Sequence, residues 1–331
     1  MDIISTLGQS LDYNNSCLLI EKLIEEGCKT FRYNLSKYDS YASTYKRIAE
    51  INRLQQTFGK DFNVLIDLPF PNKKPRLYIG DKILNVRNGQ YYYISSDYIT
   101  STSNDKIGVD IKAIGNRIVE DSRFIYDDGK GYFAVDSILD SETVRVKAMG
   151  DFCIHDRKSI FVNHILVNTE ADWDYIKMVR DINPNSIALS FVERAEDIDV
   201  YKGFFSGIEL ISKIETEKAV KNIDQIAKKS NVMIARGDLL LYSDPFELFV
   251  TQRKIFEAAK KNQKHLYIAT GILNSLTENI IPSQSDLIDL YTILSMAPKG
   301  IILNFPLVIQ KHTEAFDTIT KMLNLRIKLW N

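Results

Sequence analysis

Short β-rich runs alternate with amphipathic helical stretches eight times along this chain of 331 residues, and this alternation constrains the fold most. The expected strands are residues 2–7, 29–34, 62–68, 186–192, 207–215, 231–236, 265–270 and 300–305. The expected helices are residues 15–27, 40–56, 170–182, 195–205, 217–229, 245–262, 284–296 and 309–327. Eight such units predict a closed (β/α)8 barrel, or TIM barrel. A doubly wound α/β sheet is the alternative, but no G-x-G-x-x-G motif follows the first strand to support dinucleotide binding.

A segment of different character interrupts the alternation after the third strand. The stretch "PFPNKKP" (69–75) is polar and rich in proline, which is typical of a boundary. From about residue 79 to residue 153 only short strands and turns follow, with hairpin signals at Asp128-Gly129 and Gly131. We therefore predict a small all-β domain at 79–153, inserted into a barrel formed by residues 1–78 and 154–331.

Composition excludes several classes of partner. The apolar content of 45% and charged content of 26% are ordinary for a globular protein, and the net charge of −1 gives no electrostatic footprint for nucleic acid. No apolar run approaches the roughly 18 residues of a membrane span, and the N-terminus lacks the features of a signal peptide. The three cysteines fit neither a disulfide framework nor a CxxC motif. We expect a cytoplasmic protein without a nucleic-acid or membrane partner.

Polar residues gather where the expected strands end. In a (β/α)8 barrel the active site lies at the C-terminal ends of the strands, so side chains from these ends converge on one mouth. Five of the eight strands end in polar groups, namely Arg32, Asn34 and Ser36; Asp67; Lys213 and Glu215; Arg236, Gly237 and Asp238; and Thr270. Holding so many polar groups for packing alone is costly, which favours a functional site.

The types of these residues indicate a cation and an anion. Glu215 and Asp238 follow neighbouring strands and form a natural pair of oxygen ligands for Mg²⁺ or Mn²⁺. Lys213 points to the same side of its strand as Glu215 and can hold an anion beside that ion. Arg32 can bind a phosphate through two parallel hydrogen bonds. Alternatively, Lys213 and Glu215 form a strand-end salt bridge, and Asp238 caps the following helix.

Several segments resemble motifs of the pyruvate kinase family, and they occur in the same order. "ISKIET" (211–216) and "VMIARGDL" (232–239) are similar, almost letter for letter, to that family's K-I-E and A-R-G-D-L segments. The other similar segments are "IISTLGQS" (3–10), "FRYNLSKYD" (31–39), "VLIDL" (64–68), "FIYDDGKGYFAV" (124–135) and "IATGIL" (268–273). The resemblance implies a catalytic barrel interrupted after its third strand by a β-barrel lid domain.

The resemblance also implies roles for the residues at the barrel mouth. Arg32 and Lys213 would hold the phosphoryl group of phosphoenolpyruvate, and Lys213 would also stabilise the enolate oxygen. Glu215 and Asp238 would ligate Mg²⁺ or Mn²⁺. The backbone N–H groups of Gly237 and Asp238 would receive the substrate carboxylate, with Thr270 beside it.

Two further binding sites follow from the same resemblance. Asn34, Ser36 and Asp67 match the family's site for a monovalent cation, usually K⁺. Lys74 or Arg76 would take the place of an arginine that reaches the phosphates of the nucleotide.

The departures from the family gather on the nucleotide side and at the proton relay. They are Gln9 for Pro, Lys37 for His, Leu68 for Thr, "PSQSD" (282–286) for P-T-R-A-E, Asn304 for Ser and Pro306 for Glu. The family's C-terminal domain has no counterpart in this sequence, so a homo-oligomer would not form through it.

We therefore expect a metal-dependent phosphotransferase that moves a phosphoryl group between phosphoenolpyruvate and ADP or a different acceptor. One alternative is enolate chemistry without a nucleotide, of aldolase, lyase or mutase type, on pyruvate or a related 2-oxoacid. Another is a non-catalytic relative that binds or regulates.

Overall fold

The protein forms two compact units, which we call the barrel unit (residues 1–71 and 170–331) and the lid unit (residues 72–169). The structure is a computed structural model that describes residues 1–8, 11–35, 41–80, 83–98, 103–119, 122–162, 165–168 and 173–330. The predicted insertion at 79–153 lies inside the lid unit, which takes in several more residues at each end.

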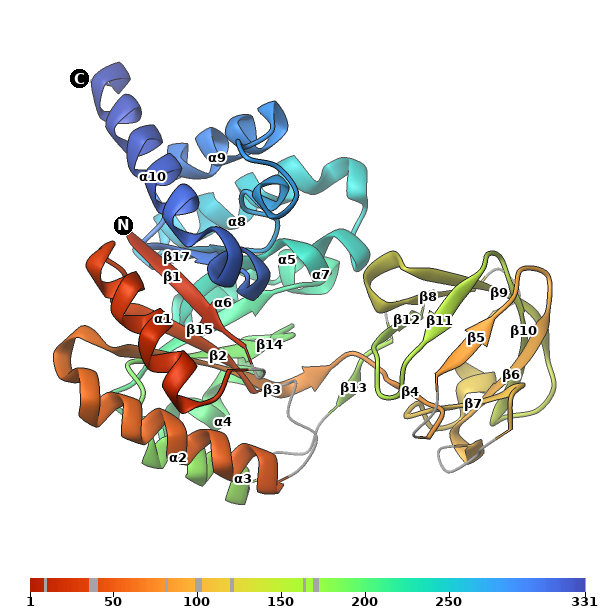
Figure 1. Ribbon diagram of the computed structural model, residues 1–331. Helices are drawn as coiled ribbons and strands as arrows, with labels where there is room; N and C mark the ends of the chain where they lie inside the picture. Colours follow the sequence, from red (N-terminus) through yellow and green to blue (C-terminus); the bar gives the residue numbers. More distant parts are fainter. Residues whose placement is uncertain are drawn as a thin grey trace. The chain divides into compact units, whose positions relative to one another are not determined.

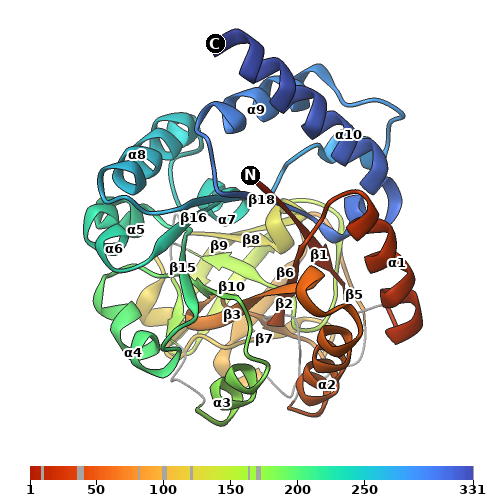
Figure 2. The same ribbon diagram turned by 90° about the vertical axis from the view of Figure 1, so that its left-hand side faces the viewer.

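The barrel unit contains a closed ring of eight parallel strands (Figures 1 and 2). The strands are β1 (Asp2–Leu7), β2 (Thr30–Asn34), β3 (Asn63–Lys73), β14 (Ser186–Ser190), β15 (Glu209–Ile214), β16 (Asn231–Ala235), β17 (Leu266–Ala269) and β18 (Gly300–Leu303). They pair in the order β3-β14-β15-β16-β17-β18-β1-β2, and the parallel pairing of β2 with β3 closes the ring. The predicted (β/α)8 barrel is confirmed, and the doubly wound alternative is wrong because an open sheet would leave two edges unpaired.

Helices surround these strands, as Figure 2 shows. They are α1 (Tyr13–Glu25), α2 (Tyr41–Phe58), α3 (Trp173–Asp181), α4 (Glu196–Phe204), α5 (Glu217–Lys221), α6 (Ile223–Lys229), α7 (Arg236–Leu241), α8 (Leu248–Lys261), α9 (Gln284–Ser295) and α10 (Phe305–Trp330). Among the helices within the described ranges, none is both long and apolar enough to cross a membrane.

Two helices differ from the sequence-based expectation. The single helix predicted at 217–229 is divided into α5 and α6 at Asn222, whose side-chain amide donates to the carbonyl of Glu193 at 2.9 Å. This bond ties Asn222 to the segment that follows β14. The short helix α7 was not predicted at all, and it directly follows β16.

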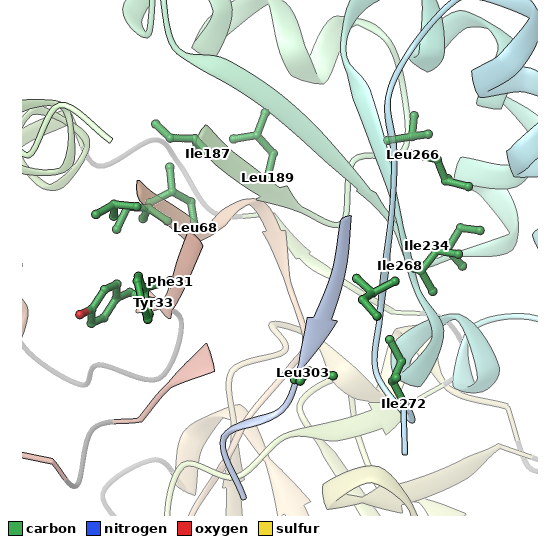
Figure 3. Close-up of a cluster of buried hydrophobic side chains, with 14 of the residues drawn as sticks. Phe31, Tyr33, Leu68, Ile187, Leu189, Ile234, Leu266, Ile268, Ile272 and Leu303 are labelled. Atoms are coloured by element: carbon green, nitrogen blue, oxygen red, sulfur yellow. The ribbon is translucent and has the colours of Figure 1, made fainter. Parts of the chain in front are cut away.

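The main hydrophobic core lies between the helices and the outward faces of the strands. Figure 3 shows part of it, with Phe31 and Tyr33 on β2, Ile187 and Leu189 on β14, and Leu303 on β18. Residues at i and i+2 of a strand share a face, so these pairs point outward together.

A second, smaller apolar cluster fills the inside of the barrel. It consists of Ile4, Leu65, Ala188, Ile211, Met233, Tyr267, Ala269 and Ile302. Two residues beyond members of this inner layer, on the same inward face, the strands carry the polar side chains of Thr6, Asp67, Ser190 and Lys213. These polar side chains, which we call the polar level, therefore lie directly next to the inner apolar cluster.

The lid unit is built from short strands around a core of its own. They are β4 (Leu77–Tyr78), β5 (Leu84–Val86), β6 (Tyr91–Ser95), β7 (Lys106–Val109), β8 (Arg123–Tyr126), β9 (Gly131–Ile138), β10 (Thr143–Ala148), β11 (Phe152–Ile154), β12 (Ile160–Val162) and β13 (Val167–Asn168). Seven form one sheet in the order β12-β8-β9-β10-β6-β7-β4, and a bridge between Arg76 and Ser159 joins its two ends. This barrel-like closure confirms the predicted lid architecture.

Truncating the inner layer should destabilise the protein much more than truncating a surface leucine. Leu65→Ala removes a fully buried side chain from β3 and should lower the free energy of unfolding by about 2–5 kcal/mol. Leu18 on α1 is 59% exposed, so Leu18→Ala should cost about 0.5 kcal/mol or less. Urea denaturation followed by circular dichroism measures both, and equal losses would contradict the packing described here.

Candidate active site

The polar level at the C-terminal ends of the strands is organised around Asp67, which is fully buried on β3. Its Oδ2 accepts hydrogen bonds from Nη2 and Nε of Arg32 at 2.6 and 3.2 Å, and its Oδ1 lies 3.2 Å from Nζ of Lys213. Burial alone would raise the pKa of Asp67, but the charges of Lys213 and Arg32 outweigh it and hold the pKa below its usual value. An ionised Asp67 thus holds two cationic side chains next to each other.

Lys213 also contacts Glu215, as the alternation along the strand predicted. Nζ of Lys213 lies 3.0 Å from Oε1 of Glu215 and donates a hydrogen bond to Oγ of Ser190 at 3.1 Å. Burial opposes the charge of the ammonium, but Asp67 and Glu215 together raise the pKa of Lys213 above its ordinary value. Lys213 is therefore a fixed positive charge at the centre of the site.

Glu215 is fully buried, and its two oxygens differ in their surroundings. Oε2 accepts a hydrogen bond from the backbone N–H of Phe191 at 2.6 Å, whereas Oε1 accepts none from the residues that the structure describes. Burial raises the pKa of Glu215 to about 7, the charge of Asp238 adds to this effect, and Lys213 opposes it. When Glu215 is ionised, the charge of Lys213 and the hydrogen bond from Phe191 do not fully offset the cost of burying its negative charge.

These charges fit a divalent cation. The carboxylates of Asp67, Glu215 and Asp238 act on Lys213 together with the guanidinium of Arg32, so the cluster carries one negative charge in excess when all are ionised. Within the described ranges no group of three or more His, Cys, Asp or Glu side chains could hold a metal ion. An ion at Glu215 and Asp238 would therefore have two protein carboxylates and take its other ligands from water and substrate, as Mg²⁺ commonly does.

Thr270 and Gly237 also meet at this end of the barrel. Thr270 follows β17 and is exposed, and Gly237 lies in the first turn of α7. A Cβ added to Gly237 would come within 2.9 Å of Cγ2 of Thr270, so a side chain at position 237 would displace Thr270. The carbonyl of Thr270 accepts hydrogen bonds from Nε and Nη2 of Arg236 at 2.8 and 2.6 Å.

The remaining predicted residues are only partly placed. Asn34 ends β2 and lies opposite Asp67 in the register of β2 and β3. Ser36 lies outside the residues that the structure describes, as do Gln9 and Lys37. Both oxygens of Asp67 bond to cationic side chains, so the K⁺ site implied by the resemblance stays a prediction.

Lys74 and Arg76, the predicted phosphate contacts, belong to the lid unit. Nη1 of Arg76 donates a hydrogen bond to the carbonyl of Arg157 at 2.6 Å. Burial alone would raise the pKa of Asp127, but neighbouring lysines, Lys74 among them, lower it. Their role toward a nucleotide also stays a prediction.

Sequence reasoning missed Thr6 and Ser190, which contact the site directly. Oγ1 of Thr6 accepts a hydrogen bond from Nη1 of Arg32 at 3.1 Å, and Ser190 bonds to both Lys213 and Asp67. Both are polar residues near the end of an apolar strand, so the rule that selected Lys213 could also have found them.

Comparisons with known proteins agree with the geometry. A family model described as "Pyruvate kinase, barrel domain" matches residues 1–296. A pyruvate kinase of Thermotoga maritima is 27% identical over 332 residues, covering 97% of this chain and 69% of its own length. A pyruvate kinase of Thermoplasma acidophilum is 26% identical, covering 87% of this chain and 51% of its own length.

Pyruvate kinase 2 of Saccharomyces cerevisiae is 30% identical over 303 residues, covering 87% of this chain and 58% of its own length. The crystal structure of a pyruvate kinase from Cryptosporidium parvum shares the fold, with a TM-score of 0.77 over 98% of this chain and 69% of its own, at 21% identity. The chain thus spans between about half and 69% of these relatives. Because the family model covers most of the chain, and the quoted motifs lie within it, this chain belongs to the pyruvate kinase family.

Proposed function

We propose that this protein is a metal-dependent phosphotransferase that moves a phosphoryl group between phosphoenolpyruvate and an acceptor, either ADP or another molecule. The observation that carries the proposal is the position of Lys213 Nζ, 3.0 Å from Glu215 and 3.2 Å from Asp67, with Arg32 on the other oxygen of Asp67. Asp67 thus holds two cationic groups next to each other, and one of them, Lys213, also lies beside Glu215, the carboxylate that lacks full compensation. Membership of the pyruvate kinase family supports the same reading.

Arg32 and Lys213 bind the transferred phosphoryl group in this proposal. Arg32 keeps its orientation through Thr6 and Asp67, so its guanidinium is positioned before a substrate arrives. Lys213 has three partners, Ser190, Asp67 and Glu215. These three side chains hold the ammonium of Lys213 in place, so its positive charge is positioned before a substrate anion arrives.

Glu215 and Asp238 hold Mg²⁺ or Mn²⁺ in the proposed enzyme. Such an ion supplies a Lewis acid that stabilises negative charge on phosphate and enolate oxygens. Gly237 and Asp238 offer backbone N–H groups to the substrate carboxylate, and Thr270 lies against Gly237. The apolar inner layer beneath strengthens these charge interactions because it excludes water from below.

K⁺ remains part of the proposal on the resemblance alone, with Asn34, Ser36 and Asp67 as its ligands. The proposed cytoplasmic location rests on composition alone. The phosphoryl acceptor depends on Lys74 and Arg76 in the lid unit, whose sequence departs from the family pattern.

Enolate chemistry without a nucleotide is the second candidate, and Asn304 is the observation that favours it. Asn304 follows β18, where the family has a serine implicated in proton delivery. Its Nδ2 donates to Oδ1 of Asn274 at 2.6 Å, and its Oδ1 accepts from the backbone N–H of Leu307 at 2.9 Å. The amide of Asn304 can donate a hydrogen bond but cannot act as a general acid that protonates an enolate near neutral pH. The enolate would therefore have to react with another electrophile or take its proton from another group.

Replacing Glu215 should strongly weaken metal-assisted binding of an enolate analogue. For Glu215→Gln we expect oxalate affinity in the presence of Mg²⁺ to fall about 100-fold, measured by calorimetry, because the ion loses one of two carboxylates. Phosphoryl transfer from phosphoenolpyruvate, followed by ³¹P NMR with a panel of acceptors, should fall with it.

Glu217→Gln is the matched control for this experiment. Glu217 lies two residues further on, is 57% exposed and pairs with Lys221 on the surface of α5. Its loss should leave both measurements unchanged. Wild-type oxalate affinity in Glu215→Gln would contradict the proposed metal site, and turnover of a 2-oxoacid without any acceptor would favour the second candidate.

The stability of the metal-free protein should depend on pH through Glu215. Because its pKa rises from 4.5 to about 7 on folding, the folded state binds the proton more tightly than the unfolded state. Its favourable contribution is complete below pH 4.5 and is lost as pH rises to 7. In EDTA, Glu215→Gln should therefore be more stable than the wild type at pH 8, by up to about 3 kcal/mol, and should lose this advantage at pH 5. Urea midpoints at the two pH values measure this, and parallel changes in both proteins would disprove it.

A further inference from the structure

The backbone of Thr270 adopts a conformation that its side chain disfavours. Its φ is +76°, in the left-handed region, where a β-branched residue is a rare outlier. Such a conformation persists only where the surroundings hold it in place, and it often occurs at functional sites. Thr270 is also exposed at the mouth of the barrel, so packing of its side chain does not explain the strain.

The guanidinium of Arg236 holds this strained peptide. Nε and Nη2 both donate to the carbonyl of Thr270, at 2.8 and 2.6 Å. Arg236 is buried, with 9% of its surface exposed. Two donors in the fixed plane of a guanidinium restrict the direction of the carbonyl more than a single donor would.

Asp289 on α9 fixes the other side of the same guanidinium. Nη1 of Arg236 donates to Oδ1 and Oδ2 of Asp289 at 2.6 and 2.8 Å. One carboxylate therefore sets the orientation of Arg236, which in turn sets the orientation of Thr270. The carboxylate of Asp289 also compensates the buried charge of Arg236, so neutralising Arg236 needs no metal ligand or substrate group.

Two glycines leave the space that this arrangement needs. A Cβ at Gly271, whose φ is +76°, would lie 3.3 Å from Nη2 of Arg236, and a Cβ at Gly237 would lie 2.9 Å from Cγ2 of Thr270. The side chain of Thr270 is thereby seated against the first turn of α7, next to Asp238.

We propose that Arg236 and Asp289 are a positioning pair that holds Thr270 against Gly237, in the orientation in which it meets the substrate. Neither residue touches the reacting atoms; both act through Thr270. The inference rests on the proposed function in one respect, namely that Thr270 contacts the substrate. The hydrogen bonds that Arg236 makes to the carbonyl of Thr270 do not depend on any substrate.

Three variants test the pair through binding of oxalate with Mg²⁺. Asp289→Asn removes the charge that orients Arg236, and Arg236→Lys keeps a charge but loses the planar fork that reaches both partners. Each should weaken oxalate binding about 10- to 100-fold, and Thr270→Ala should give a loss of similar size. Combining Asp289→Asn with Thr270→Ala should cost little more than either alone, because both changes act at one residue. Losses that multiply in the double variant would overturn the proposal.

A spectroscopic measurement separates the pair from the proposed function. In ligand-free protein with labelled threonine methyl groups, the Thr270 resonance is identified by its absence from the Thr270→Ala spectrum. We expect this resonance to shift or broaden in Asp289→Asn and Arg236→Lys. It should stay in place in the control Glu257→Gln, which removes the partner of Arg253 from the surface of α8. An unmoved resonance in all variants would overturn the positioning role, even if the wild type bound no oxalate; a moved resonance would support it in that case too.

Discussion

The charge cluster around Lys213 is the interaction on which the site depends. An ammonium buried above the apolar layer of Ile211 and Leu65 would cost several kcal/mol without partners. Asp67 and Glu215 supply that compensation, but Asp67 also serves Arg32, and Asp238 adds further negative charge. The cluster therefore stabilises the charges of Lys213 and Asp67, whereas the negative charge of Glu215 is stabilised incompletely, and this is the reason for proposing that one more cation binds there.

The two-residue period of a strand explains how much of this could be predicted. The same alternation that turns Ile211 inward also turns Lys213 inward, so the sequence alone placed Lys213 and Glu215 on one side. Counting eight strands favoured a closed barrel but could not exclude an open sheet, because pairings such as that of β2 with β3 join segments that lie close together in the sequence. What distinguishes the barrel is the pairing of β1 with β18, nearly 300 residues apart, and no local pattern reports it.

Long-range contacts account for what the sequence could not provide. Asp289 on α9 is 53 residues from its partner Arg236, and a sequence pattern shows neither this contact nor the direction of the guanidinium. The pKa of Glu215 depends on its burial, on Lys213 and on Asp238 in α7, the helix that follows the neighbouring strand β16. The helix α7 escaped prediction since it has six residues and begins with Arg-Gly, which is too short and too glycine-rich for a periodic signal.

The residues proposed to bind the phosphoryl donor and those proposed to bind the acceptor lie in different units of the protein. Every side chain proposed to hold the metal ion, the phosphoryl group or the enolate lies in the barrel unit, where Lys213 contacts both Glu215 and Asp67. The residues proposed to meet the acceptor, Lys74 and Arg76, lie in the lid unit and are engaged there by lid residues. In the proposed reaction, a barrel unit that retains its charge cluster would keep the binding site for the phosphoryl donor, whereas sequence changes in the lid unit would alter which acceptor is bound. The proposal therefore leaves the acceptor, rather than the phosphoryl donor, as the property in which this chain would differ from its relatives.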